Sequence, residues 1–582
     1  MLRFLTCGVL RESYRSLTKK ERALFWVLAV VCIFSGIALS VLFIANRTIR
    51  APASGGIYRE AIIGGPRFIN PLLAPANDTD RDLVKLIYAG LVTYDSQGAI
   101  VPDLADSYAV STDTKTYTFT LRENLTWHDG IPLTVDDVVF TIRLMQNVEY
   151  QSPLRASWQG VKVEKRDART VALVLSVPYA PFLAHATVGI LPKHIWQDVS
   201  PQGFAFSDYN LKPVGAGPFR FADIEREKDG QVTSLTLERN MAYHREPAYL
   251  NTVVLKFFES DEDALDAFKN GEVDGVGISG ARTSDMQQGG AAYSLSLPRI
   301  FAVFFNQNHA KALSYKSVRE ALDAATDKNR IVQNVYGDEK YAEALHGPLP
   351  ASVFGYTDDM PQRPTGREAA SALLEKNGWK LNDEGVRELR EKVKQEQIIN
   401  RKKVLVDIVA TTTLEFSLLT ANVPELEKTA QFLKEDWEAI GARVDIEVAG
   451  VADIQGERVR PREYDAVLFG QVLGLDPDPY AFWHSSQKRD PGLNLALYHN
   501  PKVDKLLEEA RQTSSEEERK KKLGEFQKFV ADDIPAVFLF SPRYTYYISG
   551  QIMGIPTRII ATPAERFGGI AEWYVKTKRV WR

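Results

Sequence analysis

The motifs by which enzymes are usually recognised are missing from this chain of 582 residues. There is no GxxxxGK phosphate loop followed by Ser or Thr, no GxSxG nucleophile elbow and no HExxH zinc motif. The eight histidines stand singly, and no two of them have the i, i+4 spacing that places two ligands on one helix face. The sequence therefore predicts no catalytic residue, no metal site built from neighbouring ligands and no cofactor.

One pair of carboxylates has a spacing that acid–base chemistry could use. Asp476 and Asp478 stand in the run Asp-Pro-Asp-Pro, and two nearby carboxylates can act as acid and base. The prolines restrict φ and favour a stiff, extended turn, and no partner base follows in the sequence. We interpret the run as a structural turn, and a hydrolase that uses these two aspartates is the less favoured alternative.

The composition is that of a folded protein with more than one lobe. Hydrophobic residues make up 45% and charged residues 25% of the chain. A single core stops growing at about 250–300 residues, so a chain of this length is expected to divide. The net charge of -4 lacks the basic excess of a dedicated nucleic-acid binder, so no nucleic-acid partner is expected.

A hydrophobic segment near the N-terminus predicts the compartment. Residues 24–45 carry no charge and would span about 33 Å as a helix, enough to cross a bilayer. The tail before this segment has six basic residues against two acidic ones. By the positive-inside rule we expect a cytoplasmic tail at 1–23, a transmembrane signal anchor at 24–45 and a linker at 46–55. The rest of this single-pass chain would then lie outside the cytoplasm, in the periplasm or at the cell surface.

The alternative is a signal peptide that is removed. The apolar core of a signal peptide usually runs for about 7–15 residues, which is shorter than this segment. Ala51-Pro-Ala53 has the small-x-small form of a cleavage site, but Arg47 and Arg50 separate it from the apolar run. Both cysteines, Cys7 and Cys32, precede the outer part, which therefore has no disulfide and depends on its core alone.

Strand and helix patterns alternate along the outer part and indicate an α/β class. Runs of β-branched and aromatic residues predict strands at 117–121, 171–175, 253–258, 301–305, 404–409 and 443–448. Apolar residues at helical spacing predict helices at 135–145, 261–270, 317–326 and 427–440. The densely charged segment 382–403 is typical of a solvated helical hairpin or of an insertion in a surface loop.

An ordered set of short motifs resembles one known family. Residues 117–142 read YTFTLRENLTWHDGIPLTVDDVVFTI, and the runs VGAGPFRF at 214–221 and NGEVD at 270–274 follow. DPDP at 476–479 and WHSS at 483–486 come later in the same order. Together they resemble the extracytoplasmic solute-binding proteins of the peptide/nickel/opine class, which serve ABC importers. The resemblance extends from about residue 56 to residue 550 and beyond.

This resemblance implies an α/β, periplasmic-binding-protein-like fold of two lobes with an extra subdomain, making three subdomains, hinged around a ligand cleft. The implied boundaries are 56–90, 179–305 and 546–582 for lobe I, 91–178 for the extra subdomain, and 306–545 for lobe II. The implied role is to bind a peptide or a related small solute and deliver it to an ABC permease and its ATPase, without catalysis. The outer part is expected to be monomeric. A ligand-binding sensor and a chaperone-like scavenger on the same fold remain alternatives.

The resemblance also implies where the ligand binds. In peptide-binding relatives an aspartate three residues before the acidic-Pro pair holds the α-ammonium group, but here that position is Leu473 or Leu475. Leucine cannot pair a buried cation, so either Asp476 or Asp478 replaces it or the ligand is not a peptide with a free N-terminus. Ligand clefts combine flat apolar walls with a few polar anchors. The residues that we expect around the ligand are Asn77, Phe301, Phe469, Gln471, Asp476, Tyr480 and Trp483.

Overall fold

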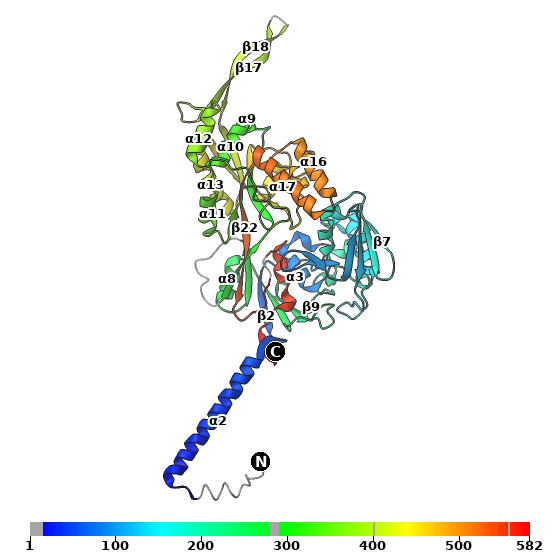
Figure 1. Ribbon diagram of the computed structural model, residues 1–582. Coiled ribbons are helices and arrows are strands. Elements are labelled where there is room, and N and C mark those ends of the chain that lie inside the picture. The colour runs from blue at the N-terminus through cyan, green and yellow to red at the C-terminus, as the bar shows by residue number, and fades with distance from the viewer. Residues whose placement is uncertain (1–15, 280–289, 400–401, 557–558, 582) are drawn as a thin grey trace.

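The structure, a computed structural model, describes residues 16–279, 290–399, 402–556 and 559–581 (Figure 1). One large mixed sheet runs through the body in the order β20-β19-β21-β14-β22-β12-β2-β11-β10-β9, and β13 and β15 also pair with β22. Its strands are β2 (Ile57–Ile63), β9 (Phe219–Arg226), β10 (Val232–Arg239), β11 (Thr252–Phe258), β12 (Gly275–Ser279), β13 (Gly290–Ser296), β14 (Arg299–Phe305), β15 (Ala342–Ala344), β19 (Glu415–Ala421), β20 (Arg443–Ala449), β21 (Ala466–Val472) and β22 (Ala536–Ser549).

Helices pack against the large sheet, and a smaller antiparallel sheet lies at one side of the body (Figure 1). The main helices are α3 (Asp78–Ile87), α4 (Val135–Gln146), α8 (Asp261–Lys269), α10 (Lys316–Ala325), α11 (Lys328–Tyr336), α12 (Arg367–Lys376), α13 (Pro424–Glu438), α16 (Pro501–Gln512) and α17 (Glu516–Asp533). The smaller sheet has the order β5-β6-β8-β7, with strands β5 (Ala105–Val110), β6 (Thr116–Leu121), β7 (Lys162–Lys165) and β8 (Thr170–Val174). The predicted strands and helices are therefore present, with ends shifted by a few residues, and the α/β class is confirmed.

The hydrophobic core is divided into two large clusters, and the chain passes from one cluster to the other twice. One cluster takes residues from Tyr58 to Leu297 and again from Tyr544 to Trp573, and we call this part the first lobe. The other takes residues from Ile300 to Phe540, the second lobe. The crossings are therefore residues 298–299 and 541–543. The second crossing lies inside β22, whose early residues pair with β14 and whose late residues pair with β12.

The charged segment 382–403 does not form the helical hairpin that was one of its two predicted forms. Strands β17 (Arg387–Ile399) and β18 (Lys402–Thr413) make an antiparallel hairpin, with Val393 opposite Ile408, that projects from the top of the molecule in Figure 1. The helical prediction was wrong because it ignored the predicted strand at 404–409. The β-branched residues of that strand favour an extended partner, and the charged segment supplies it.

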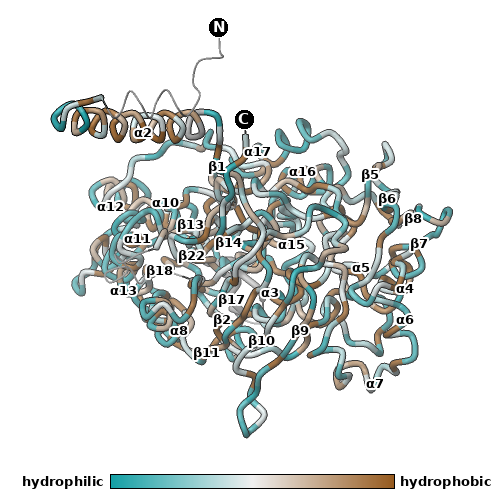
Figure 2. The backbone as a smooth tube through the Cα atoms, turned by 90° about the horizontal axis from the view of Figure 1, so that it is seen from below, coloured by the Kyte–Doolittle hydropathy of each residue, from teal (hydrophilic) through white to brown (hydrophobic). Residues whose placement is uncertain are grey.

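A long hydrophobic helix extends from the opposite end of the body. Helix α2 (Lys19–Arg47) begins with a capping box between Thr18 and Glu21, and Lys19–Phe43 is long and apolar enough to cross a membrane. Figure 2 colours it brown along most of its length, and it stands clear of the body in Figure 1. The predicted linker at 46–55 is mostly a strand, because β1 (Thr48–Ala53) pairs with the C-terminal strand β23 (Lys576–Trp581).

A buried histidine holds the glycine turn of the first lobe. A Cβ on Gly215 would lie 2.1 Å from the carbonyl oxygen of Ile87, so only glycine fits there. His128 accepts a hydrogen bond from the Gly215 amide at Nδ1, and its Nε2 lies 3.1 Å from the Gly217 carbonyl oxygen. This arrangement requires the neutral ring, protonated at Nε2. Burial lowers the pKa of His128 from 6.5 to about 4.

This lowered pKa predicts acid sensitivity. The unfolded imidazole binds a proton below a pH of about 6.5, whereas the folded one does so only near 4. Protons therefore favour the unfolded chain in this window, and stability is lost as the pH falls through it. Between pH 7 and pH 4 we expect the unfolding free energy of the native chain to fall by about 3 kcal/mol more than that of His128→Gln. Urea titrations at both pH values measure the difference, and parallel losses in the two chains would contradict it.

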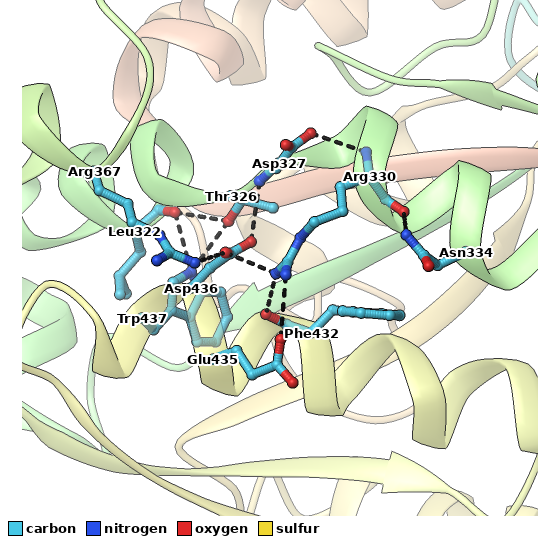
Figure 3. Close-up of polar contacts among 10 residues, drawn as sticks. All are labelled: Leu322, Thr326, Asp327, Arg330, Asn334, Arg367, Phe432, Glu435, Asp436 and Trp437. Atoms are coloured by element: carbon cyan, nitrogen blue, oxygen red, sulfur yellow. Dashed lines mark hydrogen bonds and ion pairs between the residues drawn. The ribbon is translucent and has the colours of Figure 1, made fainter.

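A buried carboxylate joins three helices of the second lobe (Figure 3). Asp436 on α13 lies 2.8 Å from Arg330 on α11 and 3.3 Å from Arg367, the first residue of α12. Its other oxygen accepts a hydrogen bond from the backbone amide of Asp327. The neighbouring Trp437 donates from Nε1 to the Leu322 carbonyl oxygen. These contacts fix the helices that pack against the second lobe's part of the sheet.

Substitutions at two adjacent residues compare the contribution of this buried contact to stability with that of an exposed one. Asp436→Ala removes both ion pairs and the amide contact, so we expect a loss of about 2–3 kcal/mol in unfolding free energy. Glu435→Ala is the matched control, because Glu435 contacts the same Arg330 at 3.2 Å but its side chain is 59% exposed. Exposed pairs contribute less than about 1 kcal/mol. Equal losses on chemical denaturation would show that burial does not decide the contribution.

Candidate functional site

A cavity lies where the first lobe meets the start of β14 and the end of β21. Its volume is about 560 Å³, a size that accommodates a small molecule or a short peptide. Helix α3, residues 184–189 and the short helix η7 (Pro563–Phe567) form the walls of the first lobe. Arg299 and Val472 line the side of the second lobe's strands. The cavity therefore touches a crossing between the lobes, where closure of the lobes would change its shape.

The charged groups of this wall are paired, with one exception. Lys85 lies 2.7 Å from Glu565, and Arg245 lies 3.1 Å from Asp103. Asp103 also contacts His244 at 2.8 Å, and although burial opposes ionisation, His244 and Arg245 lower its pKa. Arg81 contacts Asp78 just outside the lining.

The exception is Arg299, at the first crossing. It forms no ion pair with any residue that the structure describes. His185 also lines the cavity, and burial lowers its pKa, which favours the neutral ring at physiological pH. The one charge of the wall without a partner in the described chain is therefore a cation.

A fully buried arginine holds the first-lobe wall in place. The guanidinium of Arg566, in η7, contacts Glu60 on β2 at 3.0 Å and Asp82 on α3 at 2.8 and 2.7 Å. Burial alone would lower the pKa of Arg566, but these two carboxylates and Tyr544 outweigh it and hold the pKa well above its usual value. The neighbours of Arg566 in sequence, Glu565 and Phe567, line the cavity. The charge network therefore fixes η7 against α3 on the cavity's first-lobe side.

None of the seven residues predicted around the ligand is among those that line this cavity. Asn77 caps α3, where its side chain accepts a hydrogen bond from the Asp80 amide, next to the cavity. Phe301 lies two positions after Arg299 on β14 and therefore on the same face of the sheet, where its ring contacts Phe540 at 5.5 Å. Of the seven, Phe301 is the one whose strand face leads into the cavity.

Three of the seven residues belong to the second lobe's packing. Trp483 is buried in the core, with its ring against Phe538. Phe469 packs against that core as well, and Gln471 is 4% exposed. The amide of Gln471 has no hydrogen-bond partner among the described residues, and strand alternation directs it to the face opposite Val472. Trp483, which the sequence suggested as part of a ligand wall, therefore belongs to the core.

The remaining predicted residues, in the DPDP loop, already have partners. Asp478 forms an ion pair with Arg511 of α16, whose guanidinium also stacks on Tyr480 at 3.8 Å. Asp476 forms an ion pair with Arg519 of α17. Burial lowers the pKa of Arg519 to about 10, so it stays charged at neutral pH. Neither aspartate is free to hold an ammonium group, and Leu473 and Leu475 are both buried.

Sequence reasoning missed the lining residues because they come from distant segments. Lys85, Asp103, Arg245, Arg299 and Glu565 follow no local motif and are brought together only by the fold. The one signal that could have located part of the site is the start of the predicted strand at 301–305. A charged residue, Arg299, precedes that strand at the point where the sequence passes between the lobes.

Comparison with known proteins identifies the family. Residues 99–492 match the model of the bacterial extracellular solute-binding proteins, family 5. The chain is 26% identical over 508 residues to the oligopeptide-binding protein AppA of Bacillus subtilis, covering 86% of this chain and 88% of AppA. It is 26% identical over 471 residues to the nickel-binding periplasmic protein of Escherichia coli, covering 78% and 82% of the two chains.

A solved structure agrees with this match. The ABC transporter substrate-binding protein CtaP of Listeria monocytogenes superposes with a TM-score of 0.74 at 25% identity, over 90% of this chain and 100% of CtaP. The two-lobed α/β fold predicted from the sequence is thus that of the periplasmic binding proteins. The members of this family bind solutes and are not enzymes, which agrees with the missing catalytic motifs. The chain belongs to family 5 of the bacterial extracellular solute-binding proteins.

Proposed function

We propose that this chain is the substrate-binding component of an ABC importer for a peptide or a related solute, anchored in the membrane by α2. The family match and the peptide-binding relative support the first part. The exposed apolar helix supports the second, with the N-terminus in the cytoplasm and the two lobes outside. The lobes would close over the ligand and deliver it to a permease and its ATPase.

Two contacts of the C-terminal strand support an anchor over a removed signal peptide. The small-x-small site at Ala51-Pro-Ala53 lies inside β1, which is paired along its whole length with β23. Cleavage after Ala53 would remove the whole of β1 together with α2, whose Phe43 ring lies 6.4 Å from the ring of Trp581. These contacts between β23 and the N-terminal segment support our proposal that the segment is retained.

We propose further that the ligand carries a carboxylate or another anionic group that binds Arg299. The observation that carries this is the charge of the cavity wall, where Asp103 and Glu565 have cationic partners and Arg299 has none among the described residues. A buried or half-buried cation gains most from an anionic partner with matching hydrogen bonds. The occupied Asp476 and Asp478 argue against recognition of a free α-ammonium group.

Ligand retained through native purification of the full chain tests this proposal. Mass spectrometry should find anionic solutes, and adding them back should raise the unfolding free energy by RT ln(1 + [L]/Kd), about 2.7 kcal/mol at a ligand concentration of 100 Kd. Arg299→Gln should weaken binding by about 10- to 100-fold, the effect of losing one charged hydrogen bond. Arg59→Gln is the control, because Arg59 pairs with Asp274 and does not line the cavity.

Blocking one end of the ligand at a time decides which group is recognised. Amidation of the ligand's carboxylate should abolish binding, whereas acetylation of any amine should leave binding within a few-fold of its original strength. The opposite pattern would show that an ammonium group is held and that Arg299 is not the anchor. Ligand turnover would instead favour the hydrolase alternative.

A further inference from the structure

A short two-stranded ribbon connects the hydrophobic helix to the body. It consists of β1 and β23, and we call it the membrane ribbon. Strand β1 begins at Thr48, directly after the last residue of α2, so helix and ribbon are continuous. Figure 1 shows the C-terminus of the chain beside the end of α2 that meets the body. The ribbon thus lies at the place where the helix would leave the bilayer.

The membrane ribbon carries an excess of positive charge that no described residue compensates. Residues 46–56 and 575–582 contain no aspartate or glutamate. Arg50 and Arg579 lie directly opposite each other in the antiparallel register, and Lys578 and Lys576 follow on β23. Like charges in opposite positions destabilise a strand pair. None of these four exposed cations forms an ion pair with any residue that the structure describes, so they suit an anionic partner outside the chain.

The apolar residues of the ribbon lie nearest the helix. Its first two pairs are Thr48 with Trp581 and Ile49 with Val580. Trp581 is 65% exposed and Ile49 46% exposed, and the Trp581 ring contacts Phe43 on the helix. Tryptophan near the end of a membrane helix is typical of the headgroup region.

The cations follow one step further from the helix. Arg50 is two residues beyond Thr48, or about 7 Å along an extended strand. The span from the end of α2 to Arg50 is therefore shorter than the Debye length, about 8 Å at physiological ionic strength, over which a charged surface attracts a cation. The order of apolar residues followed by cations therefore matches the order of hydrocarbon followed by phosphate-containing headgroups across one half of a bilayer.

We propose that the membrane ribbon binds the phosphate groups of anionic phospholipids in the outer leaflet of the bilayer that α2 crosses. The bound lipid would relieve the repulsion between Arg50 and Arg579 and fix the first lobe over the membrane. The second lobe, joined through residues 298–299 and 541–543, would then be the one that moves. This proposal rests on the proposed anchoring by α2 and is independent of which ligand the cavity binds.

Hydrogen exchange of the full chain in lipid nanodiscs tests the proposal. The backbone amides of β1 and β23 should exchange at least tenfold more slowly in discs that contain phosphatidylglycerol than in discs of phosphatidylcholine alone. High salt should remove the difference, because the contact is electrostatic. The triple variant Arg50→Gln, Lys578→Gln and Arg579→Gln should show the same exchange in both lipids. The control variant Lys162→Gln, Arg220→Gln and Lys228→Gln changes exposed cations outside the ribbon and should keep the lipid effect.

The native chain carries the decisive comparison, so the result does not depend on how well the variants fold. Equal exchange of the ribbon in the two lipids would overturn the proposal. Protection that appears only when a permease is added would also overturn it, since the ribbon would then bind a protein. A purified chain whose mass lacks α2 would overturn the anchoring, and the ribbon proposal with it, while leaving ligand binding by the cavity intact.

Discussion

The first lobe depends on one buried guanidinium. Arg566 contacts Glu60 and Asp82, residues that are 506 and 484 positions away in the chain, and it thereby joins a strand, a helix and the C-terminal segment. Three buried charges are costly unless their hydrogen bonds are complete, and here Asp82 is bound through both oxygens. Burial raises the pKa of Glu60, and the contacts with Arg566 and the hydroxyl of Tyr58 oppose this. The network therefore joins the N- and C-terminal segments of the lobe and holds the cavity wall between them.

This constraint holds the first-lobe wall together, and the proposed closure of the lobes would then take place at the crossings. The wall of α3 and η7 is held by the charge network, whereas the second lobe is joined to it through residues 298–299 and the middle of β22. Arg299 belongs to the first of these crossings and also lines the cavity. An anion bound to Arg299 would therefore touch the fixed wall and the moving lobe at once, which is the arrangement by which ligand binding can favour a closed form.

The sequence predicted the elements better than the site, for a physical reason. Periodicity and caps are local, so the helix at 135–145, capped by Thr134 with Asp137, is found within a residue of its observed end. The pairing of Thr48–Ala53 with Lys576–Trp581 is not local, and nothing in the run around Pro52 shows that a strand partner exists at the other end of the chain. The residues that line the cavity are likewise far apart in the sequence. Trp483 has the residue type of a ligand wall, but contact with Phe304, Phe526 and Phe538 makes it core.

The DPDP loop shows that two aspartates in a sequence do not by themselves predict that an ammonium group is bound. Two carboxylates beside a cleft would suit an ammonium group if they were free, but Arg511 and Arg519 bind them to α16 and α17. Releasing Asp476 would leave the buried Arg519 without its partner, and releasing Asp478 would do the same to the half-buried Arg511. Either loss costs more than an exposed pair gains. An ammonium ligand would therefore have to compete with an existing ion pair, whereas an anionic ligand at Arg299 displaces no ion pair among the described residues. In our proposal the cavity favours an anion because of which ion pairs a ligand would have to break, and not because acidic residues are present or absent.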